Sequence, residues 1–355
     1  MRSFVPLAAV LALTIAGVAG SASARPIPHH HHRQKVVSAA ATALSIDRVP
    51  LPGDGRGDYL MVDAPSGRLF VTHSKVVHIL DLATLQPVAT VMGLTAAHGV
   101  ALDAAGHGYV SDGNSDSVIE FDPATGAQIA RIAVGKKPDS ILYDPASARI
   151  MAFDGQSEEI SVIDPAKTAV VATIKLPHGP EYAQTDGQGH VYVNLEDGNS
   201  IAVIDSRTMA LDHVIALTGC DGPAPLALDG ANRRLFSGCG NHVMVVADAD
   251  TGKIVSSVPV GDDPDGIVFD PGTHRVFVAN RDGSWTIVDQ LGADRYRVEQ
   301  TLKIDTYAKT LAIDRATHRV FSSTADLEWL PAVAGKKHLP NAKPGTFRLL
   351  VVSQH

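Results

Sequence analysis

Long hydrophobic runs are absent from the 355-residue sequence after residue 18. A membrane-spanning helix needs about 20 consecutive apolar residues, so we expect none in the rest of the chain. Runs of Lys or Arg are also missing, and the formal net charge is -8 at pH 7. Because neutralising a phosphate backbone needs a basic patch or stripe, the sequence predicts no nucleic-acid partner.

Linear catalytic motifs are missing as well. The sequence contains no Gly-x-Ser-x-Gly, no His-Glu-x-x-His and no glycine-rich phosphate loop before a helix. Their absence argues against sites built on one continuous segment. It does not exclude a site assembled from residues that lie far apart in the chain.

The first 24 residues have the features of a secretory signal peptide. Arg2 precedes an apolar run over residues 5–18, and Ala22-Ser23-Ala24 fits the small-x-small rule for cleavage. We therefore expect cleavage after Ala24 and a soluble periplasmic or secreted chain that does not contact the membrane. A retained N-terminal anchor is the alternative.

Cysteine is scarce, since Cys220 and Cys239 are the only two. An exported chain meets an oxidising environment, so we expect a disulfide bond between them. Closing a loop of this size contributes ~3 kcal/mol. Two separate buried thiols are the alternative.

Residues 25–41 predict a flexible tail with four consecutive histidines, which are His29, His30, His31 and His32. Adjacent imidazoles bind Zn, Cu or Ni. One hypothesis is therefore a periplasmic metal-handling protein that uses this tail. A solvated low-complexity tail is the alternative.

An internal repeat fills the rest of the sequence. A short apolar strand that ends in Asp recurs seven times, with spacings of 40 to 44 residues. These anchoring aspartates are Asp63, Asp103, Asp144, Asp186, Asp229, Asp270 and Asp314. Each repeat continues with further short strands bounded by Gly, Pro, Asp and Asn. Four short strands per unit are typical of propeller blades, so the sequence predicts an all-β, seven-bladed β-propeller of four-stranded blades.

The two ends of the repeat region complete each other. The last unit lacks a fourth strand, whereas residues 42–53 have the pattern of a fourth strand without the other three. We expect this N-terminal strand to pair with the C-terminal blade and close the ring, which leaves no open sheet edge. Residues 42–355 are then one domain, which we expect to be a monomer.

Drifted copies of a Tyr-Val-Thr-Asn motif occur in the second strands, as FVTH at 70–73, YVSD at 109–112, YVNL at 192–195 and FVAN at 277–280. Together with turns such as DPATG and DADTG, these copies resemble the YVTN-type repeat of bacterial seven-bladed β-propeller proteins. The resemblance covers residues 42–355 and implies an exported propeller. Related rings include lactonases, lyases and electron-transfer domains, so the resemblance does not choose an activity.

Asp112, Asn114 and Asp116 have the alternating spacing of the start of a calcium-binding loop. An EF-hand needs Gly at the sixth position and Glu at the twelfth, where this sequence has Ser117 and Pro123. The equivalent loops of other repeats are also polar and contain glycine, which is typical of hairpin turns. We therefore predict a turn here and not a calcium site.

The residue five positions before each anchoring aspartate is expected to face the central channel, because the first strand of a blade lines it. These ring positions hold Asp58, His98, Asp139, Glu181, Ala224, Asp265 and Lys309. The second strands end at the same mouth of the channel, which adds His73 and Asp112. Carboxylates and a histidine around a wet channel suit a divalent ion or a cationic or polyhydroxylated ligand. Simple solvation is the alternative.

Three functional hypotheses follow. The first is non-enzymatic binding of a small ligand or a protein partner at this mouth, because the repeat is strong and catalytic signals are weak. The second is a metal-assisted hydrolase, lactonase or lyase, with His98, Glu181 and Asp139 as catalytic candidates. The third is metal handling by the histidine tail. A divalent metal ion is the one cofactor that these residues suggest.

The last repeat carries an insertion at residues 325–345, where other repeats have a short loop. Trp329 and Leu330 are its apolar anchors. We expect a lid or a partner-docking loop at the channel mouth, with a disordered elaboration as the alternative.

Overall fold

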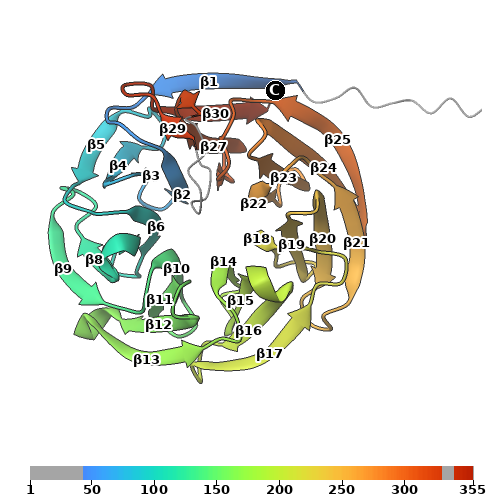
Figure 1. Cartoon of the computed structure of the whole chain (residues 1–355), viewed down its shortest axis with the longest axis horizontal. Helices are drawn as coiled ribbons and strands as arrows, with labels where there is room; N and C mark the ends of the chain where they lie inside the picture. The colour runs from blue at the N-terminus through green and yellow to red at the C-terminus, as the bar shows by residue number, and fades with distance from the viewer. Residues whose placement is uncertain (1–42, 330–339, 355) are drawn as a thin grey trace, which may run out of the picture. The chain divides into compact units, whose positions relative to one another are not determined.

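The computed structural model describes residues 43–329 and 340–354. The expected signal peptide (1–24), the tail with its four histidines (25–41) and Leu330 lie outside these residues. Within them the chain is a ring of seven four-stranded antiparallel sheets, so the predicted seven-bladed β-propeller is confirmed (Figure 1). No helix in this part of the chain is long and apolar enough to cross a membrane.

Each of the first four blades is a run of consecutive strands. Blade 1 contains β2 (Gly57–Asp63), β3 (Arg68–His73), β4 (Val76–Asp81) and β5 (Pro87–Val91). Blade 2 contains β6 (Ala97–Leu102), β7 (Gly108–Asp112), β8 (Ser117–Phe121) and β9 (Gln128–Ala133). Blade 3 contains β10 (Pro138–Asp144), β11 (Arg149–Asp154), β12 (Glu159–Asp164) and β13 (Ala169–Lys175). Blade 4 contains β14 (Pro180–Thr185), β15 (His190–Leu195), β16 (Ser200–Asp205) and β17 (Ala210–Ala216).

Blades 5 and 6 follow the same order, whereas blade 7 combines both ends of the domain. Blade 5 contains β18 (Pro223–Asp229), β19 (Arg234–Cys239), β20 (Val243–Asp248) and β21 (Ile254–Pro259). Blade 6 contains β22 (Pro264–Asp270), β23 (Arg275–Asn280), β24 (Ser284–Gly292) and β25 (Arg295–Lys303). Blade 7 contains β26 (Ala312–Asp314), β27 (Arg319–Thr324), β30 (Arg348–Gln354) and β1 (Leu44–Pro50).

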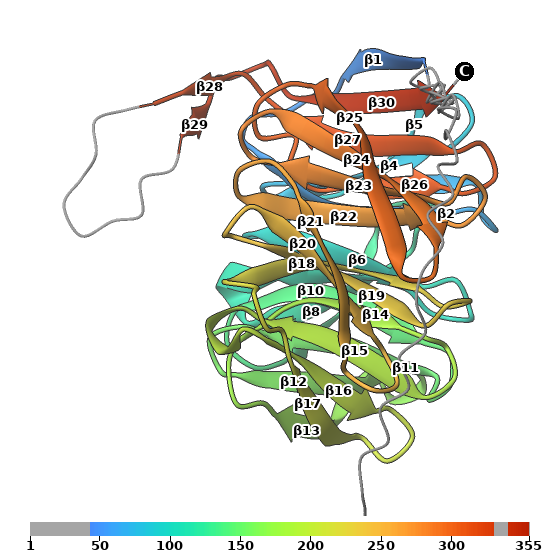
Figure 2. The ribbon, with the colours of Figure 1, turned by 90° about the vertical axis from the view of Figure 1, so that its right-hand side faces the viewer.

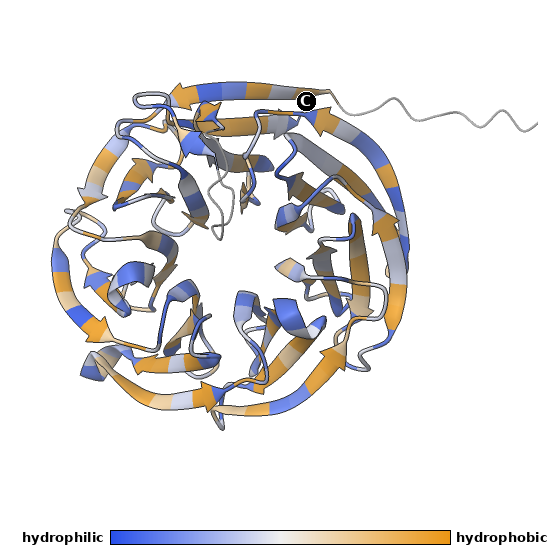
Figure 3. Cartoon of the chain, viewed as in Figure 1, coloured by the Kyte–Doolittle hydropathy of each residue, from blue (hydrophilic) through white to orange (hydrophobic). Residues whose placement is uncertain are grey.

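The ring closes as predicted. Strand β1 is the outermost strand of blade 7 and pairs antiparallel with β30, with Leu44 opposite Gln354 and Pro50 opposite Arg348. The first strands of the blades surround the channel and the fourth strands form the rim (Figure 1). Along the rim strands, hydrophobic and hydrophilic residues alternate (Figure 3), because successive side chains of a strand point to opposite faces.

The hydrophobic core lies between neighbouring blades. One cluster joins Phe70 of blade 1 to Val110 and Phe121 of blade 2, and all three are fully buried. Equivalent clusters join the other blades, so each sheet packs face to face against the next. Three short 3-10 turns, η1 (Gly113–Ser115), η2 (Pro165–Lys167) and η3 (Glu196–Gly198), connect strands at the edges.

All seven anchoring aspartates have the same structural role. In every repeat the carboxylate accepts a hydrogen bond from a backbone N–H in the turn that follows, and the donors are Ser66, Ala105, Ser147, Gln188, Ala231, Gly272 and Ala316. Short side chains of this kind satisfy the backbone of tight turns. The aspartate that recurs in the sequence therefore stabilises the turn after the first strand of each blade.

Two further sequence features have clear structural outcomes. Cys220 and Cys239 form the predicted disulfide bond. The insertion contains a separate two-stranded hairpin of β28 (Leu327–Glu328) and β29 (Asn341–Ala342), which extends from the ring (Figure 2). Its role as a lid or docking loop stays a prediction.

Candidate functional site

The ring positions occupy β-bulges at one mouth of the channel. In blades 1 to 6 the ladder between the first and second strands shifts register directly at the ring position, as between Pro138 and Ile141 in blade 3. Pro138 lies opposite Asp154, the last residue of the second strand, so both strand ends meet at this mouth. A bulge re-aims side chains locally, and it turns the ring residues toward one another instead of into a ladder.

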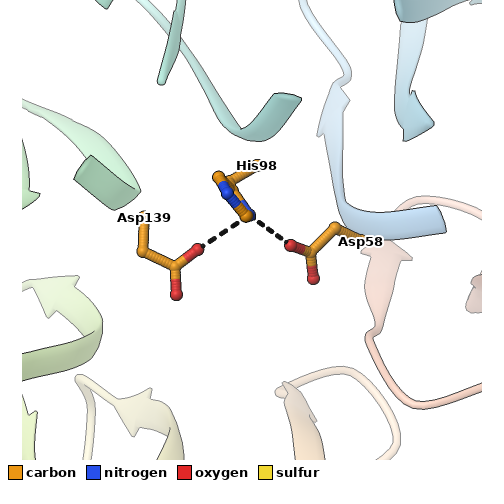
Figure 4. Close-up of side chains that lie close together, drawn as sticks. All are labelled: Asp58, His98 and Asp139. Carbon is orange, nitrogen blue, oxygen red and sulfur yellow. Dashed lines mark hydrogen bonds and ion pairs between the residues drawn. The ribbon is translucent and has the colours of Figure 1, made fainter. Parts of the chain in front are cut away.

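Asp58, His98 and Asp139 converge from the first three blades (Figure 4). His98 Nδ1 lies 2.6 Å from Asp58 Oδ2 and 3.1 Å from Asp139 Oδ1. One atom of each residue lies within 4.8 Å of the other two, a spacing at which the three could hold a metal ion. A Cβ at Gly113 would lie 2.6 Å from His98 Nε2, so this glycine makes room for the imidazole.

The proton on His98 Nδ1 cannot satisfy both carboxylates. It serves the shorter hydrogen bond, to Asp58, and the buried Asp139 Oδ1 has no hydrogen-bond donor in the described residues. Protonation of the imidazole would not help, because the second proton goes to Nε2. Burial raises the pKa of Asp139, and the neighbouring His98 only partly offsets this.

Lys309 and Arg281 neutralise the other side of the cluster. Lys309 Nζ lies 3.2 Å from Asp58 Oδ1 and 2.6 Å from Asp265 Oδ2, and Arg281 pairs with Asp265 at 3.0 Å. Burial alone would raise the pKa of Asp58, but Lys309 and His98 outweigh it and hold this pKa well below its usual range. Burial lowers the pKa of Lys309, but Asp265 and Asp58 raise it further, so the amine stays charged.

Glu181 behaves differently from the other ring carboxylates. Burial, together with the nearby carboxylates of Asp139 and Glu196, raises the pKa of Glu181 to about 9. It therefore keeps its proton at neutral pH. Asp139, Glu181, Glu196 and Asp197 line an acidic cavity of about 380 Å³ in blades 3 and 4.

A second cavity, which we call the basic cup, lies on the other side of His98. Its volume is about 290 Å³, and it is lined by Arg56, Gly57, Asp58, Ser74, Ala96, Ala97, His98, Arg281, Tyr307 and Lys309. Tyr59 and Tyr182 each follow a ring position by one residue, and the centroids of their aromatic rings lie 5.1 Å apart. The side chains of Asp58, His98 and Lys309 keep about a fifth of their surface exposed, so solvent and small solutes reach them.

Two predicted mouth residues do not face this site. His73 is buried, with its ring stacked on Phe347 at 3.6 Å and its Nδ1 3.3 Å from His78 Nε2. Asp112 is also buried, and its carboxylate accepts hydrogen bonds from the backbone N–H groups of Thr95 and Ala96. Both side chains fix neighbouring loops, because the second strands end behind the first strands and not beside the channel.

The calcium-like spacing near Asp112 has a similar outcome. Residues Gly113–Ser115 form the turn η1, and the Asp116 carboxylate pairs with Lys136 Nζ at 2.6 Å. In the described chain neither Asp112 nor Asp116 belongs to a group of three His, Cys, Asp or Glu side chains that could share an ion.

Sequence reasoning missed three residues of the basic cup. Arg56 lies in the loop before β2, Arg281 follows the last residue of β23, and Tyr307 precedes β26. Arg281 lies one residue beyond a second strand, and Arg56 and Tyr307 each lie two residues before a ring position, so all three occupy positions that recur in the repeat. The residue type at these positions varies from blade to blade, so the period alone does not single them out.

The fold and the site together define a seven-bladed β-propeller with a charged channel mouth. No protein-family model matches the sequence, and no curated protein does. Among solved structures, Kuenenia stuttgartiensis hydrazine synthase is similar, with a TM-score of 0.65 and 16% identity, over 77% of this chain and 92% of that chain. It is one of 1790 matching chains, and at this identity the similarity shows the propeller fold alone.

Proposed function

We propose that this protein binds a divalent metal ion at Asp58, His98 and Asp139 and uses it to bind a small ligand at the channel mouth. The observation that carries the proposal is the convergence of three ligand atoms on one point, where a single proton leaves Asp139 Oδ1 unsatisfied. A divalent ion there would satisfy all three atoms at once, and it would offset the cost of a buried carboxylate oxygen without a donor.

The surrounding residues support the same assignment. One imidazole and two carboxylates suit ions that accept mixed nitrogen and oxygen ligands, such as Zn²⁺ or Mn²⁺. Lys309 donates a hydrogen bond to Asp58 Oδ1, the oxygen that does not face His98. Hydrogen bonds of this kind from residues outside the ligand set orient metal ligands. With three protein ligands, an ion of this kind keeps a free coordination position for a ligand.

Export and membership of the YVTN-type repeat family belong to this proposal. The drifted second-strand motifs, the disulfide bond and the signal-like first 24 residues support them. On this view the mature protein is a periplasmic or secreted monomer, and the channel mouth is where its small ligand or a protein partner binds.

A metal-assisted hydrolase or lyase is the second candidate. It is favoured by the raised pKa of about 9 at Glu181, because a carboxyl that keeps its proton near a metal is suited to act as a general acid. His98 and Asp139 would then act as metal ligands and not as proton carriers. Turnover that is lost in Glu181→Gln, with metal binding retained, would favour catalysis over binding.

Zinc titration tests the proposal. The mature chain with His29–His32 replaced by alanine removes the competing tail, and calorimetry should then report one Zn²⁺ site per chain. His98→Ala should abolish that site, whereas His107→Ala, at a histidine in the turn directly before β7, should leave it intact. Absence of zinc binding in the protein that retains His98, or its persistence in His98→Ala, would overturn the proposal.

A further inference from the structure

Arg56 is an unusual cation in this protein. It is partly buried in the wall of the basic cup, and its guanidinium makes no ion pair or hydrogen bond within residues 43–329 and 340–354. Other arginines have carboxylate partners, such as Arg48 with Asp305 and Arg275 with Glu299. Because a partly buried guanidinium offers five donors in a planar fork, Arg56 is suited to receive an anion from solution.

Arg281 presents a second positive charge in the same cup. Its two terminal nitrogens are each 3.0 Å from a carboxylate, one on Asp263 and one on Asp265. These pairs hold the guanidinium in place. Asp263 is more than half exposed, so solvent screens much of its charge. The wall thus combines one fixed arginine, Arg281, with one unpaired arginine, Arg56.

The charges around the cup balance only without a metal ion. Apart from the largely exposed Asp263, three carboxylates and three cations lie at or near the ring positions, and they are Asp58, Asp139, Asp265, Arg56, Arg281 and Lys309. A divalent ion on the three metal ligands therefore leaves an excess of two positive charges. A ligand with two negative charges restores neutrality in this confined site, where charges are poorly screened.

The dimensions of the cup limit the ligand to a small molecule. Its volume of about 290 Å³ is at the lower end of the range for ligand sites. Gly57, Ala96 and Ala97 contribute small side chains or none to the lining. Asp58 and His98, two of the metal ligands, line the same cup as Arg56, so one short molecule can contact both.

We propose that the basic cup binds a small dicarboxylate, with one carboxylate at the metal ion and the other at Arg56 beside Arg281. The inference rests on the proposed metal site and adds the class of ligand. An arginine fork and a carboxylate match in geometry and charge. The other carboxylate of the ligand occupies the free coordination position of the ion, since carboxylate oxygen is a ligand for Zn²⁺ and Mn²⁺.

Calorimetry with succinate tests the proposal. The protein is the mature chain with His29–His32 replaced by alanine, used first without metal and then loaded with Zn²⁺. Succinate should bind the zinc-loaded chain and bind at least about tenfold more weakly to the metal-free chain. Succinamide, the neutral diamide of the same length, should not bind, because it has no negative charge to pair with the arginine or the ion.

Arg56→Gln separates the arginine from the metal. This variant should bind Zn²⁺ normally, which also shows that it is folded, and should lose at least about tenfold in succinate affinity. Arg68→Gln is the matched control, since Arg68 belongs to the same blade but begins β3, far along the strand from the cup. It should bind both zinc and succinate as the unaltered chain does.

The outcomes distinguish the two proposals. If zinc does not bind, both the metal site and the dicarboxylate site are wrong. If zinc binds but succinate does not, or succinamide binds equally well, the ligand class is wrong and the metal site stands. Unchanged succinate affinity in Arg56→Gln would also overturn the dicarboxylate proposal, as would equal affinity in the metal-free chain.

Discussion

Two sets of seven positions, five residues apart, have opposite roles in this propeller. The anchoring aspartates lie at the ends of the first strands, and each accepts a hydrogen bond from a backbone N–H of its own turn. The ring positions lie at the beginning of the channel-lining segments. None of their carboxylates accepts a backbone N–H among the described residues, and Asp58, Asp139 and Asp265 instead meet charged side chains from other blades.

The difference shows how to separate structural from functional acids in a repeat protein. A carboxylate that is needed in every blade holds the turn of its own blade, whatever further contact it makes with a neighbouring blade, so it is present seven times. A carboxylate that belongs to a site depends on residues in neighbouring blades, so its position varies: the ring contains His98, Ala224 and Lys309 as well as acids. A residue type that is the same in all seven blades therefore indicates a structural role in a turn, and a position whose residue type varies among the blades indicates a functional site.

Asp139→Ala should have the largest effect on binding. Asp139 is a direct metal ligand in this account, and even outer partners of metal ligands contribute about 10–100-fold to affinity. We expect zinc affinity to fall more than about 100-fold. The free energy of unfolding of the metal-free protein should stay within about 0.5 kcal/mol or rise, because a buried oxygen without a donor is removed. Calorimetry and urea unfolding measure the two effects, and a loss of stability with zinc binding intact would reverse the assignment.

Asp144→Ala is the matched change at the other end of β10. The Asp144 carboxylate is fully buried and accepts hydrogen bonds from Ser147 N, Ser147 Oγ and Thr185 Oγ1. Removing it leaves these donors unsatisfied, so we expect a loss of about 1–3 kcal/mol in unfolding free energy. Zinc affinity should not change. A variant with normal stability would show that the anchoring aspartates do not hold their turns.

The structure and the sequence agree on the blades and on the closure of the ring. The blade count, the strand order, the closure by β1 and the ring positions followed from the period, because each is set by local alternation and turn residues. The convergence of His98 with Asp139 did not, since it depends on bulges that shift the ladder at the ring positions. Arg56 was missed because the residue type at its position, two residues before the ring position, varies among the repeats.

Asp154→Asn tests an acid that belongs to neither set. Asp154 is fully buried; Oδ2 accepts hydrogen bonds from Ser161 and Gly135, whereas Oδ1 has no partner in the described structure. Burial raises its pKa to about 7, above the unfolded value of about 3.9. The folded state thus binds this proton more tightly, so stability is lost as pH rises from about 4 through 7.

In Asp154→Asn this decline should be smaller. Thermal unfolding at pH 5 and pH 8 measures this decline. We expect the difference in unfolding free energy between pH 5 and pH 8 to be smaller in the variant than in the unaltered protein, by an amount on the order of 1 kcal/mol. Asp116→Asn, which carries no buried charge, serves as the control at both pH values. An unchanged difference would mean that Asp154 is ionised in the folded protein at neutral pH.

Asp116→Asn should have the smallest effect of all. Asp116 pairs with the exposed Lys136, and exposed pairs contribute little to stability because solvent screens them. Asn also tolerates the positive φ of 49° at this position. Calcium should not shift the melting temperature of either protein. A calcium-dependent shift that disappears in this variant would restore the calcium-loop interpretation of the Asp112–Asp116 spacing.

The most direct test of the central claim is anomalous diffraction from crystals of the mature protein grown with Zn²⁺. We predict one strong peak in the described domain, about 2.0–2.2 Å from His98 Nδ1, Asp58 Oδ2 and Asp139 Oδ1, as zinc bonds to nitrogen and oxygen require. A peak confined to the anchoring aspartates or to the histidine tail, or no peak between these three side chains, would contradict the account.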